Sequence, residues 1–333
     1  MKRSLSDANR VISAPRPMRA QLDQLLRKVE ARGVRSATRV CHVTAFSGGV
    51  DSSLVAALVH RVFPTTSAAC LGVSAAVPAA QIEQARDVAS FIGVPLWEFP
   101  TKEGEMKEYV ENVGKSCYYC KTTLYSTINQ VADHAVHVLQ PTTDQKDQLV
   151  LFNGTNADDK LDPTRLGLVA ATEFDVASPL DELTKTDVRQ MAKYLGLPNW
   201  NAAASPCLRS RLQFGVEATQ EHLGRVERAE AFVRSIIDLP KSSNMRVRYL
   251  AGNRAAVGMW SLAVPGDHHH SLTSRAELDA DMLPAAQKVE DAVREELLSI
   301  GKCTGWLRSN IKSLTMILQV SAPLFCDLSN PEV

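Results

Sequence analysis

Short apolar runs alternate with segments of helical periodicity along the first half of the chain. An apolar run of about four to eight residues is typical of a buried strand, whereas apolar positions at i, i+3, i+4 and i+7 indicate an amphipathic helix. On these patterns we expect strands at residues 41–46, 68–73, 95–99 and 148–152, and helices at 21–31, 51–62 and 79–92. Strands that alternate with helices predict a parallel sheet with right-handed crossovers, which is an α/β fold of the doubly wound, Rossmann-like kind.

This alternation is lost in the second half of the chain. The pattern there predicts helices at 184–195, 217–237 and 283–300, and a small β unit at 245–250 and 255–259. Residues 198–216 are irregular and loop-like. We therefore expect an N-terminal extension and helix at 1–37, a doubly wound domain at 38–197, a smaller α+β domain at 198–265 and a helical tail at 266–333.

Length and composition agree with this division and limit the classes of function. The 333 residues suffice for about two domains. Thirty-seven basic and thirty-seven acidic residues leave no net charge, so there is no global electrostatic case for nucleic-acid binding. Seven cysteines, an odd number in a long chain, indicate reduced thiols with scope for metal or sulfur chemistry rather than a disulfide framework.

The unpaired cysteines indicate a reducing compartment. No run of about eighteen apolar residues is present and the N-terminus has no hydrophobic signal core, so we expect neither secretion nor a membrane span. Residues 1–19 carry five basic side chains and one acidic side chain. This composition fits an organelle transit peptide as well as a frayed tail, so we expect a cytoplasmic protein, with organelle targeting as the alternative.

The first predicted strand is followed directly by a glycine-rich loop, Ser47-Gly48-Gly49-Val50-Asp51-Ser52-Ser53. Two glycines let a backbone approach phosphate oxygens, while successive amides at a helix N-terminus present partial positive charge to an anion. The serine hydroxyls add donors. Asp51 would repel a bare phosphate, which suggests a Mg²⁺ ion between this carboxylate and a pyrophosphate.

Three cysteines lie in sequence contexts that suggest chemistry. Cys117 and Cys120 form a C-x-x-C pair, which fits a redox pair, half of a zinc site or two iron–sulfur ligands. No second C-x-x-C is present, so we do not expect a four-cysteine zinc site. Cys207 is followed by Arg209 and Arg211, which would favour its thiolate and stabilise anionic oxygens, so Cys207 is a candidate nucleophile and Arg211 a candidate catalytic residue.

Charged residues further along the chain are candidates for substrate and metal binding. Arg246 and Arg248 alternate on a predicted strand, so both point to one face and could hold a phosphate; the alternative is a solvated strand face. Glu230 lies on a predicted helix and is a candidate Mg²⁺ ligand or acid–base carboxylate, with an ordinary surface glutamate as the alternative.

The glycine-rich loop resembles the pyrophosphate loop (PP-loop) of the ATP pyrophosphatase superfamily, whose members cleave ATP between the α and β phosphates and adenylate a substrate oxygen. Further segments narrow the resemblance: Cys117-Tyr-Tyr-Cys120-Lys121, Asn153-Gly-Thr-Asn-Ala-Asp-Asp159, Ser178-Pro-Leu180, Leu183-Thr-Lys185, Leu195-Gly-Leu-Pro198, Pro206-Cys207-Leu-Arg-Ser-Arg211 and Arg246-Val-Arg248. From Val43 to Arg254 the chain is similar to the ATP-dependent sulfurtransferase family that includes LarE, of nickel-pincer nucleotide cofactor synthesis. The resemblance implies an adenine nucleotide alpha hydrolase-like version of the Rossmann-like fold.

The resemblance also implies a reaction. Family members adenylate a carboxylate of pyridinium-3,5-biscarboxylic acid mononucleotide and convert it to a thiocarboxylate, with ATP and Mg²⁺ as cofactors. Cys207 matches the cysteine that gives up its sulfur in the sacrificial version of the reaction and becomes dehydroalanine. In related enzymes three thiolates instead hold a [4Fe-4S] cluster, the version that we favour, and Cys117, Cys120 and Cys207 match them. Gly154, Thr155 and Asn156 match the segment that lies against the nucleotide in family members.

Some positions depart from the family pattern, and other functions remain open. Asn153 replaces a usual aspartate, Ala256 stands where an acidic residue is usual, and the tail after Gly266 has no match, which bears on metal binding, substrate affinity and assembly. We expect a small pyridinium mononucleotide as the binding partner. Whether the protein forms a homo-oligomer is left open by the sequence. The alternatives are a tRNA-thiolating PP-loop enzyme, against which the zero net charge argues, and a non-enzymatic nucleotide-binding protein.

Overall fold

A computed structural model describes residues 16–34, 40–139, 148–161, 166–236, 244–251, 254–260, 303–309 and 315–320. The chain divides into two compact units. The first comprises residues 1–110 and 114–202, and the second comprises residues 111–113 and 203–333. The chain therefore passes through the second unit briefly at 111–113 before it returns to the first. Residues 1–15, which make up most of the candidate transit peptide, lie outside the described residues.

The first unit is built on a four-stranded parallel sheet, which confirms the α/β fold expected from the sequence. Its strands are β1 (Val40–Ala45), β2 (Ser67–Val73), β3 (Leu96–Pro100) and β4 (Gln148–Phe152), in the spatial order β3-β2-β1-β4. All neighbouring strands are parallel. The chain winds from β1 towards β3 and then crosses to β4 on the other side of β1. Ligands of such sheets bind at this change of direction, beyond the carboxyl ends of β1 and β4.

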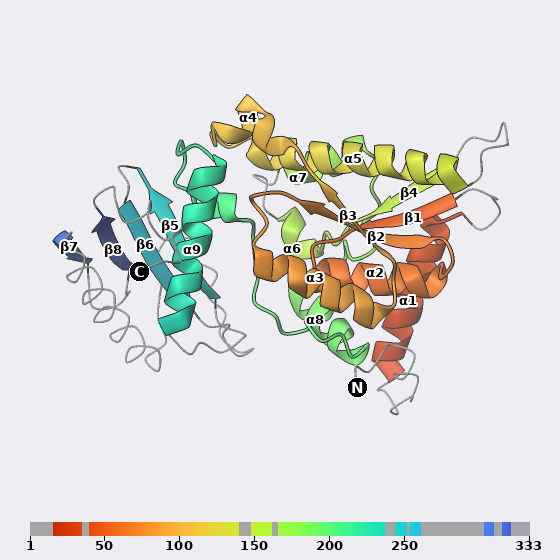
Figure 1. Cartoon of the computed structure of the whole chain (residues 1–333). Coiled ribbons are helices and arrows are strands. Elements are labelled where there is room, and N and C mark those ends of the chain that lie inside the picture. The colour runs from red at the N-terminus through yellow and green to blue at the C-terminus, as the bar shows by residue number, and fades with distance from the viewer. Residues whose placement is uncertain are drawn as a thin grey trace. The chain divides into compact units, whose positions relative to one another are not determined.

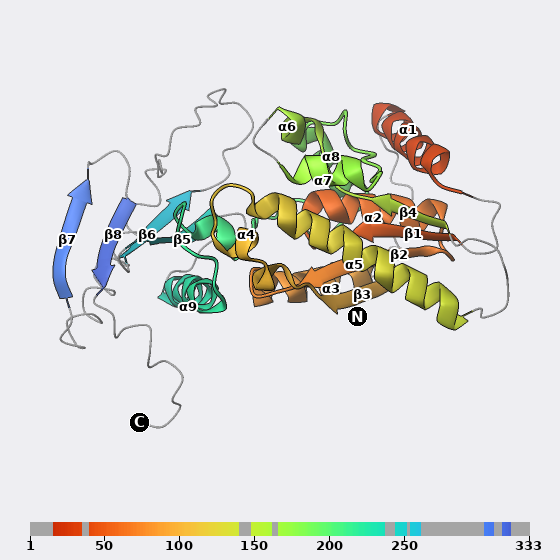
Figure 2. The same cartoon turned by 90° about the horizontal axis from the view of Figure 1, so that it is seen from above.

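Helices cover both faces of this sheet (Figure 1; Figure 2). One face carries α1 (Arg16–Arg32), α2 (Val50–Val62), α3 (Ala79–Ile92) and α8 (Lys185–Tyr194), whose apolar side chains share one core. The other face carries α5 (Ser116–Leu139) and α7 (Gly167–Glu173) over a second apolar cluster. The described part of this unit also contains three short helical segments: η2 (Glu103–Glu105), α4 (Lys107–Val110) and α6 (Ala157–Lys160).

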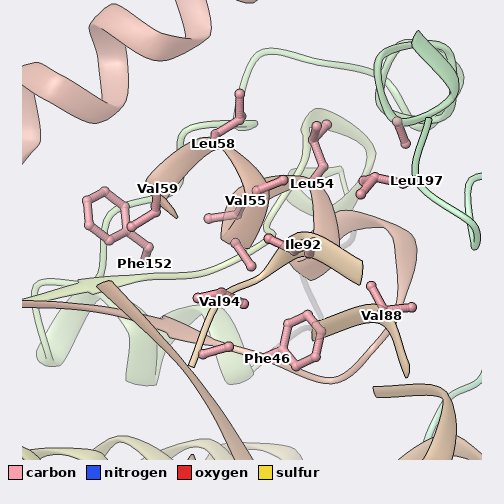
Figure 3. Close-up of a cluster of buried hydrophobic side chains, with 14 of the residues drawn as sticks. Phe46, Leu54, Val55, Leu58, Val59, Val88, Ile92, Val94, Phe152 and Leu197 are labelled. Carbon is pink, nitrogen blue, oxygen red and sulfur yellow. The ribbon is translucent and has the colours of Figure 1, made fainter. Parts of the chain in front are cut away.

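Helix α2 is the centre of the larger core, and its first turn follows the glycine-rich loop. Its residues 52–59 are all buried. Figure 3 shows the side chains around it, which include Phe46, Val88, Ile92, Val94, Phe152 and Leu197. Because protein interiors are closely packed, a shift of this helix would open cavities that cost stability. The core therefore fixes the position of the loop that precedes α2.

His42 is a buried titratable residue of β1. Its ring stacks on Phe63 with centroids 3.7 Å apart, its Nδ1 lies 2.9 Å from the Thr66 hydroxyl, and its Nε2 accepts the Val34 N–H at 3.2 Å. Burial lowers the pKa of His42 from 6.5 to about 4, against the opposing effect of a hydrogen bond with Thr66. The imidazole is therefore neutral in the folded protein at neutral pH.

We expect this histidine to make the fold less stable in mild acid. The unfolded chain takes up a proton on His42 near pH 6.5 and the folded chain only near pH 4, so stability falls as the pH decreases through this window. Between pH 7 and pH 4.5 the loss amounts to about 2 kcal/mol. Urea unfolding of the wild type and of His42→Gln between pH 7 and pH 4.5 measures it. Equal pH dependence in both proteins would contradict the assignment.

The second unit contains one helix and a small antiparallel sheet among its described residues, as the expected α+β domain does. The helix is α9 (Gln220–Ile236). The strands are β5 (Asn244–Leu250), β6 (Arg254–Trp260), β7 (Cys303–Ser309) and β8 (Thr315–Val320), in the order β5-β6-β8-β7. All three neighbouring pairs are antiparallel. A short turn, η3 (Leu208–Arg211), precedes the helix.

The tail expected at 266–333 is described only in part. Its described residues form β7 and β8, and β8 pairs with β6 from far back in the sequence. Local periodicity does not reveal a strand whose partner is so distant, since strand formation depends on the neighbouring strand. The helix expected at 283–300 lies outside the described residues. Among the described helices, none is both long and apolar enough to cross a membrane.

Candidate functional site

The glycine-rich loop joins β1 to α2 at the carboxyl edge of the parallel sheet. Gly48 has a φ of 71°, in the left-handed region that favours glycine, and Gly49 stands at the N-cap of α2. The Ser52 hydroxyl accepts the Ser47 N–H at 3.2 Å and donates to the Gly49 carbonyl at 3.1 Å, so the loop closes on itself. Because Gly49 has no side chain to cap α2, the N–H groups of its first turn have neither an intrahelical nor an N-cap partner. These N–H groups can therefore donate hydrogen bonds to a bound anion.

The Asp51 carboxylate is shared by partners from two other elements. The Asn156 amide donates to Asp51 Oδ1 at 3.0 Å, and the Lys185 ammonium pairs with Oδ2. Asn156 follows β4 and begins α6, where it forms a capping box with Asp159. Lys185 begins α8. The structure therefore brings a carboxylate, an ammonium and an amide together at the N-terminal end of α2.

The turn after β4 presses against the glycine-rich loop. A Cβ on Gly154 would lie 2.7 Å from the Ser52 nitrogen, closer than side chains pack. Asn153 shapes this turn, because its Oδ1 accepts the Thr155 N–H at 3.0 Å and the Ser178 hydroxyl at 2.7 Å. Gly154 and Asn156, expected from the family resemblance to face the nucleotide, thus contact the loop, with Thr155 between them.

Four residues that contact this site were not among the candidates from the sequence: Gln81, Gln84, Lys185 and Asn199. Lys185 occurs in the segment Leu183-Thr-Lys185, which carries the family resemblance but suggests no role by itself. Gln81 and Gln84 are three residues apart and so lie on one face of α3. The sequence could reveal this pair only through its spacing, and the spacing does not indicate which part of the protein that face of α3 contacts.

The C-x-x-C pair lies at the start of α5. Cys117 is exposed and Cys120 is half-buried, whereas Cys207 belongs to the other unit. None of the five cysteines whose side chains are described forms a disulfide. Within the described part of the chain, no group of three or more His, Cys, Asp or Glu residues is arranged to hold a metal ion. The described structure therefore does not support the [4Fe-4S] cluster that we expect from the sequence.

Cys207 begins a short turn of the second unit whose backbone is well fixed. Its carbonyl accepts the Ser210 N–H at 3.0 Å, the Ser210 hydroxyl at 2.8 Å and Arg211 Nη1 at 3.0 Å. Leu208 is fully buried, which anchors the turn, while the Cys207 side chain is half-buried. The thiol is thus held on a rigid segment and stays accessible, as a nucleophile requires.

Arg211 and Glu230 form a buried ion pair behind this turn. Arg211 Nε donates to Glu230 Oε1 at 3.0 Å, and Arg211 Nη1 also donates to the Pro206 carbonyl. Glu230 Oε1 accepts the Val247 N–H of β5 at 3.1 Å, on the edge of the sheet. The pair therefore ties the Cys207 turn, α9 and β5 together. This geometry favours a positioning role for both residues over the catalytic Arg211 and the Mg²⁺-binding Glu230 that we expect from the sequence.

Breaking this pair is expected to destabilise the second unit. Glu230→Gln leaves the Arg211 guanidinium buried without its counter-charge and should lower the unfolding free energy by about 3 kcal/mol. Glu221→Gln on the same helix is the matched control, because the Glu221 carboxylate is exposed and its pair with Arg225 contributes less than about 1 kcal/mol. Urea unfolding followed by far-ultraviolet circular dichroism measures both. Similar small losses in the two variants would contradict the structural role.

Arg246 and Arg248 lie on one face of β5, as expected from their alternation, with the buried Val247 between them. Arg248 is exposed, and Arg246 is half-buried with its Nη2 3.4 Å from the Ala204 carbonyl. Burial, with the nearby charges of Arg211 and Arg248, lowers the pKa of Arg246 to about 10, although Glu230 opposes the change. A face with several guanidinium groups in mutual interaction favours an anion.

Known proteins resemble the part of the chain that carries the glycine-rich loop. A family model described as NAD synthase matches residues 19–210, more than half of the chain. An uncharacterized protein of Synechocystis sp. is 38% identical over 194 residues, which cover 58% of this chain and 68% of that protein. The pyridinium-3,5-bisthiocarboxylic acid mononucleotide synthase of Lactiplantibacillus plantarum is 30% identical over 201 residues, 58% of this chain and 66% of that enzyme.

A third relative is matched over a similar share of its length and has no stated function. An uncharacterized protein of Methanocaldococcus jannaschii is 25% identical over 197 residues, 59% of this chain and 70% of its own length. The chain thus matches about two thirds of the length of each of these relatives. Together with the family model and the glycine-rich loop at the carboxyl edge of the sheet, these matches establish the family. The chain belongs to the PP-loop family that the NAD synthase model describes, and within it to the LarE family.

Proposed function

We propose that the protein is an ATP-dependent sulfurtransferase that acts on pyridinium-3,5-biscarboxylic acid mononucleotide. The observation that carries the proposal is the glycine-rich loop at the switch point of the sheet, with Asp51, Lys185 and Asn156 gathered beside it. Family membership supports an enzyme that uses ATP. The similarity to a relative named as a pyridinium-3,5-bisthiocarboxylic acid mononucleotide synthase supports the substrate.

The glycine-rich loop would serve the activation step. A carboxylate oxygen of the substrate attacks the α-phosphorus of ATP, the bond from this phosphorus to the bridging oxygen breaks, and pyrophosphate leaves. The N–H groups of the loop and of the first turn of α2 hold the negative charge that the pyrophosphate gains. Gly154, Thr155 and Asn156 lie on the nucleotide side of the loop. The product of this step is an acyl adenylate.

Asp51 and Lys185 would exchange partners when ATP binds. Asp51 would hold Mg²⁺ together with phosphate oxygens, the oxygen ligands that this ion prefers, and the ion would neutralise phosphate charge. Lys185 pairs with Asp51 in the described structure, so binding requires its ammonium to move from the carboxylate to a phosphate. The exchange keeps each charge paired.

Cys207 would supply the sulfur. Its thiolate attacks the acyl carbon and AMP leaves, which joins protein and substrate in a thioester. Loss of the Cα proton of Cys207 to a base then breaks the Cβ–S bond, so the substrate leaves as a thiocarboxylate and the protein keeps dehydroalanine. Arg246 and Arg248 would hold the phosphate of the mononucleotide. We propose this sacrificial route and derive no step through a cluster.

Turnover of the purified protein with MgATP and the mononucleotide tests the proposal. We expect AMP and pyrophosphate in equal amounts, a thiocarboxylate product, and a protein mass lower by one H₂S at Cys207. Absence of substrate-dependent ATP cleavage would overturn the function. Many turnovers with an unchanged protein mass would overturn the sacrificial step, and iron analysis would then test the cluster. Thiolation of added tRNA instead of the mononucleotide would favour the tRNA enzyme.

A further inference from the structure

Three side-chain amides hold the carbonyl groups of the glycine-rich loop. Gln81 Nε2 donates to the Ser47 carbonyl at 3.0 Å, and Gln84 Nε2 donates to the Gly48 carbonyl at 2.8 Å. Asn199 Nδ2 donates to the same Gly48 carbonyl, also at 2.8 Å. Gln81 and Gln84 come from α3, and Asn199 lies in the turns that follow α8. Two separate elements thus act on two consecutive peptide groups.

These hydrogen bonds determine which way the next N–H groups point. In a planar trans peptide, the C=O of one residue and the N–H of the following residue point in opposite directions. A carbonyl of Ser47 turned towards Gln81 therefore turns the Gly48 N–H away from α3, and the Gly48 carbonyl does the same for Gly49. Phosphate oxygens are attracted by N–H groups and repelled by carbonyl oxygens. The amides thus decide whether the loop offers donors or acceptors to an anion.

Asn199 shows that a donor is required at this position. The Gly48 carbonyl can only accept, so the amide nitrogen faces it, and the same nitrogen donates to Ser53 Oγ at 2.9 Å. Asn199 is 5% exposed, and its Oδ1 is buried with no hydrogen-bond partner among the described residues. An unsatisfied buried oxygen is unfavourable, and an apolar residue would avoid it. The two hydrogen bonds that Asn199 Nδ2 donates compensate for this unsatisfied oxygen.

The packing of the loop leaves little freedom for the carbonyls to turn. A Cβ on Gly48 would lie 2.8 Å from the Ala85 Cα, which shows that the loop backbone rests directly on α3. Ala85 follows Gln84 in the chain, so the amide reaches the Gly48 carbonyl at close range. A peptide flip would leave the amide donors of Gln84 and Asn199 facing an N–H group.

We propose that Gln81, Gln84 and Asn199 are positioning residues for ATP binding, which hold the Ser47 and Gly48 carbonyls on the α3 side so that the phosphates meet N–H groups. The inference rests on the proposed function, because it requires the loop to bind the phosphates of ATP. The three amides act through the backbone of the loop and touch no atom of ATP. They set the affinity for the pyrophosphate part of the nucleotide.

Gln84→Glu and Gln84→Met test the proposal by calorimetric titration with inorganic pyrophosphate, ATP and adenosine. Both variants lose the donor, and the glutamate adds a carboxylate that repels the carbonyl. We expect pyrophosphate and ATP to bind about tenfold more weakly to Gln84→Met and weaker still to Gln84→Glu, since one lost hydrogen bond is worth up to about tenfold. Affinity for adenosine is unchanged. Gln84→Lys, which restores a donor, recovers part of the loss.

Glu83→Gln is the matched control on the same helix, because Glu83 pairs with Arg86 rather than with the loop. Wild-type affinity for pyrophosphate in both Gln84→Met and Gln84→Glu would overturn the inference while the proposed function stands. If the wild type binds neither pyrophosphate nor ATP, the proposed function itself fails. Should Gln84→Glu not fold, Gln81→Met at the more exposed hydrogen bond gives the same test, with a weaker pyrophosphate affinity expected and an unchanged one opposing the inference.

Discussion

The Cys207→Ala variant is expected to cleave ATP in the presence of the pyridinium mononucleotide and to transfer no sulfur. The glycine-rich loop, which we propose activates the carboxylate, belongs to the first unit, whereas Cys207 lies on a turn of the second, so the substitution leaves the proposed activation machinery intact. Loss of the attacking atom should lower sulfur transfer by at least about a thousandfold, as removal of a covalent nucleophile does. Product analysis by mass spectrometry and a pyrophosphate assay measure the two steps separately.

Two sets of variants make this result specific. Cys41→Ala is the matched control, since burial raises the pKa of the Cys41 thiol within β1 and keeps it protonated, and we expect full sulfur transfer. Cys117→Ala and Cys120→Ala should likewise retain one round of transfer if Cys207 supplies its own sulfur. Loss of transfer in these two variants, with iron present in the wild type, would mean that the three cysteines act together. Normal transfer by Cys207→Ala would refute the assignment of the nucleophile.

The parallel sheet could be predicted because its elements are local. Each strand is a short apolar run, and both α3 and β4 begin and end at the predicted residues. The sequence pattern does not predict helix α5, because the helix contains several residues that do not favour helices, among them Thr122, Thr123 and Thr127. Packing of Tyr125 and Ile128 against the sheet stabilises it instead. The local pattern of hydrophobic and polar residues does not indicate tertiary contacts of this kind.

The candidate site was predictable to the extent that its residues are neighbours in sequence. The loop from Ser47 to Ser53 has a pattern of its own, so the sequence was enough to find it. Lys185 and Asn199 reach the loop only because α8 and the following turn pack against α2, more than a hundred residues away. The contact between Arg211 and Glu230, two candidates for catalysis and metal binding, could not be predicted either, because they are far enough apart in sequence that only the fold buries them against each other.

Gly48→Ala is expected to destabilise the first unit and to abolish ATP binding. The new Cβ would lie 2.8 to 2.9 Å from the Cα, Cβ and nitrogen of Ala85, and the backbone of α3 cannot move aside without disturbing the core. The φ of 71° adds the strain that a side chain has in the left-handed region. Together these effects should lower the unfolding free energy by about 3 kcal/mol. Urea unfolding and titration with ATP measure the two losses.

Gly49→Ala in the same loop separates folding from phosphate binding. The nearest atom to its new Cβ is Ser47 Oγ at 3.4 Å and its φ is negative, so the fold should keep its stability to within about 1 kcal/mol. Any loss of ATP affinity in this variant then reports how closely the phosphates approach the backbone. Gly154→Ala should behave like Gly48→Ala, because its Cβ would press on the Ser52 nitrogen from the opposite side. Equal stability of all three variants would mean that the loop adapts to a methyl group wherever it is placed, which the packing on Ala85 and Ser52 argues against.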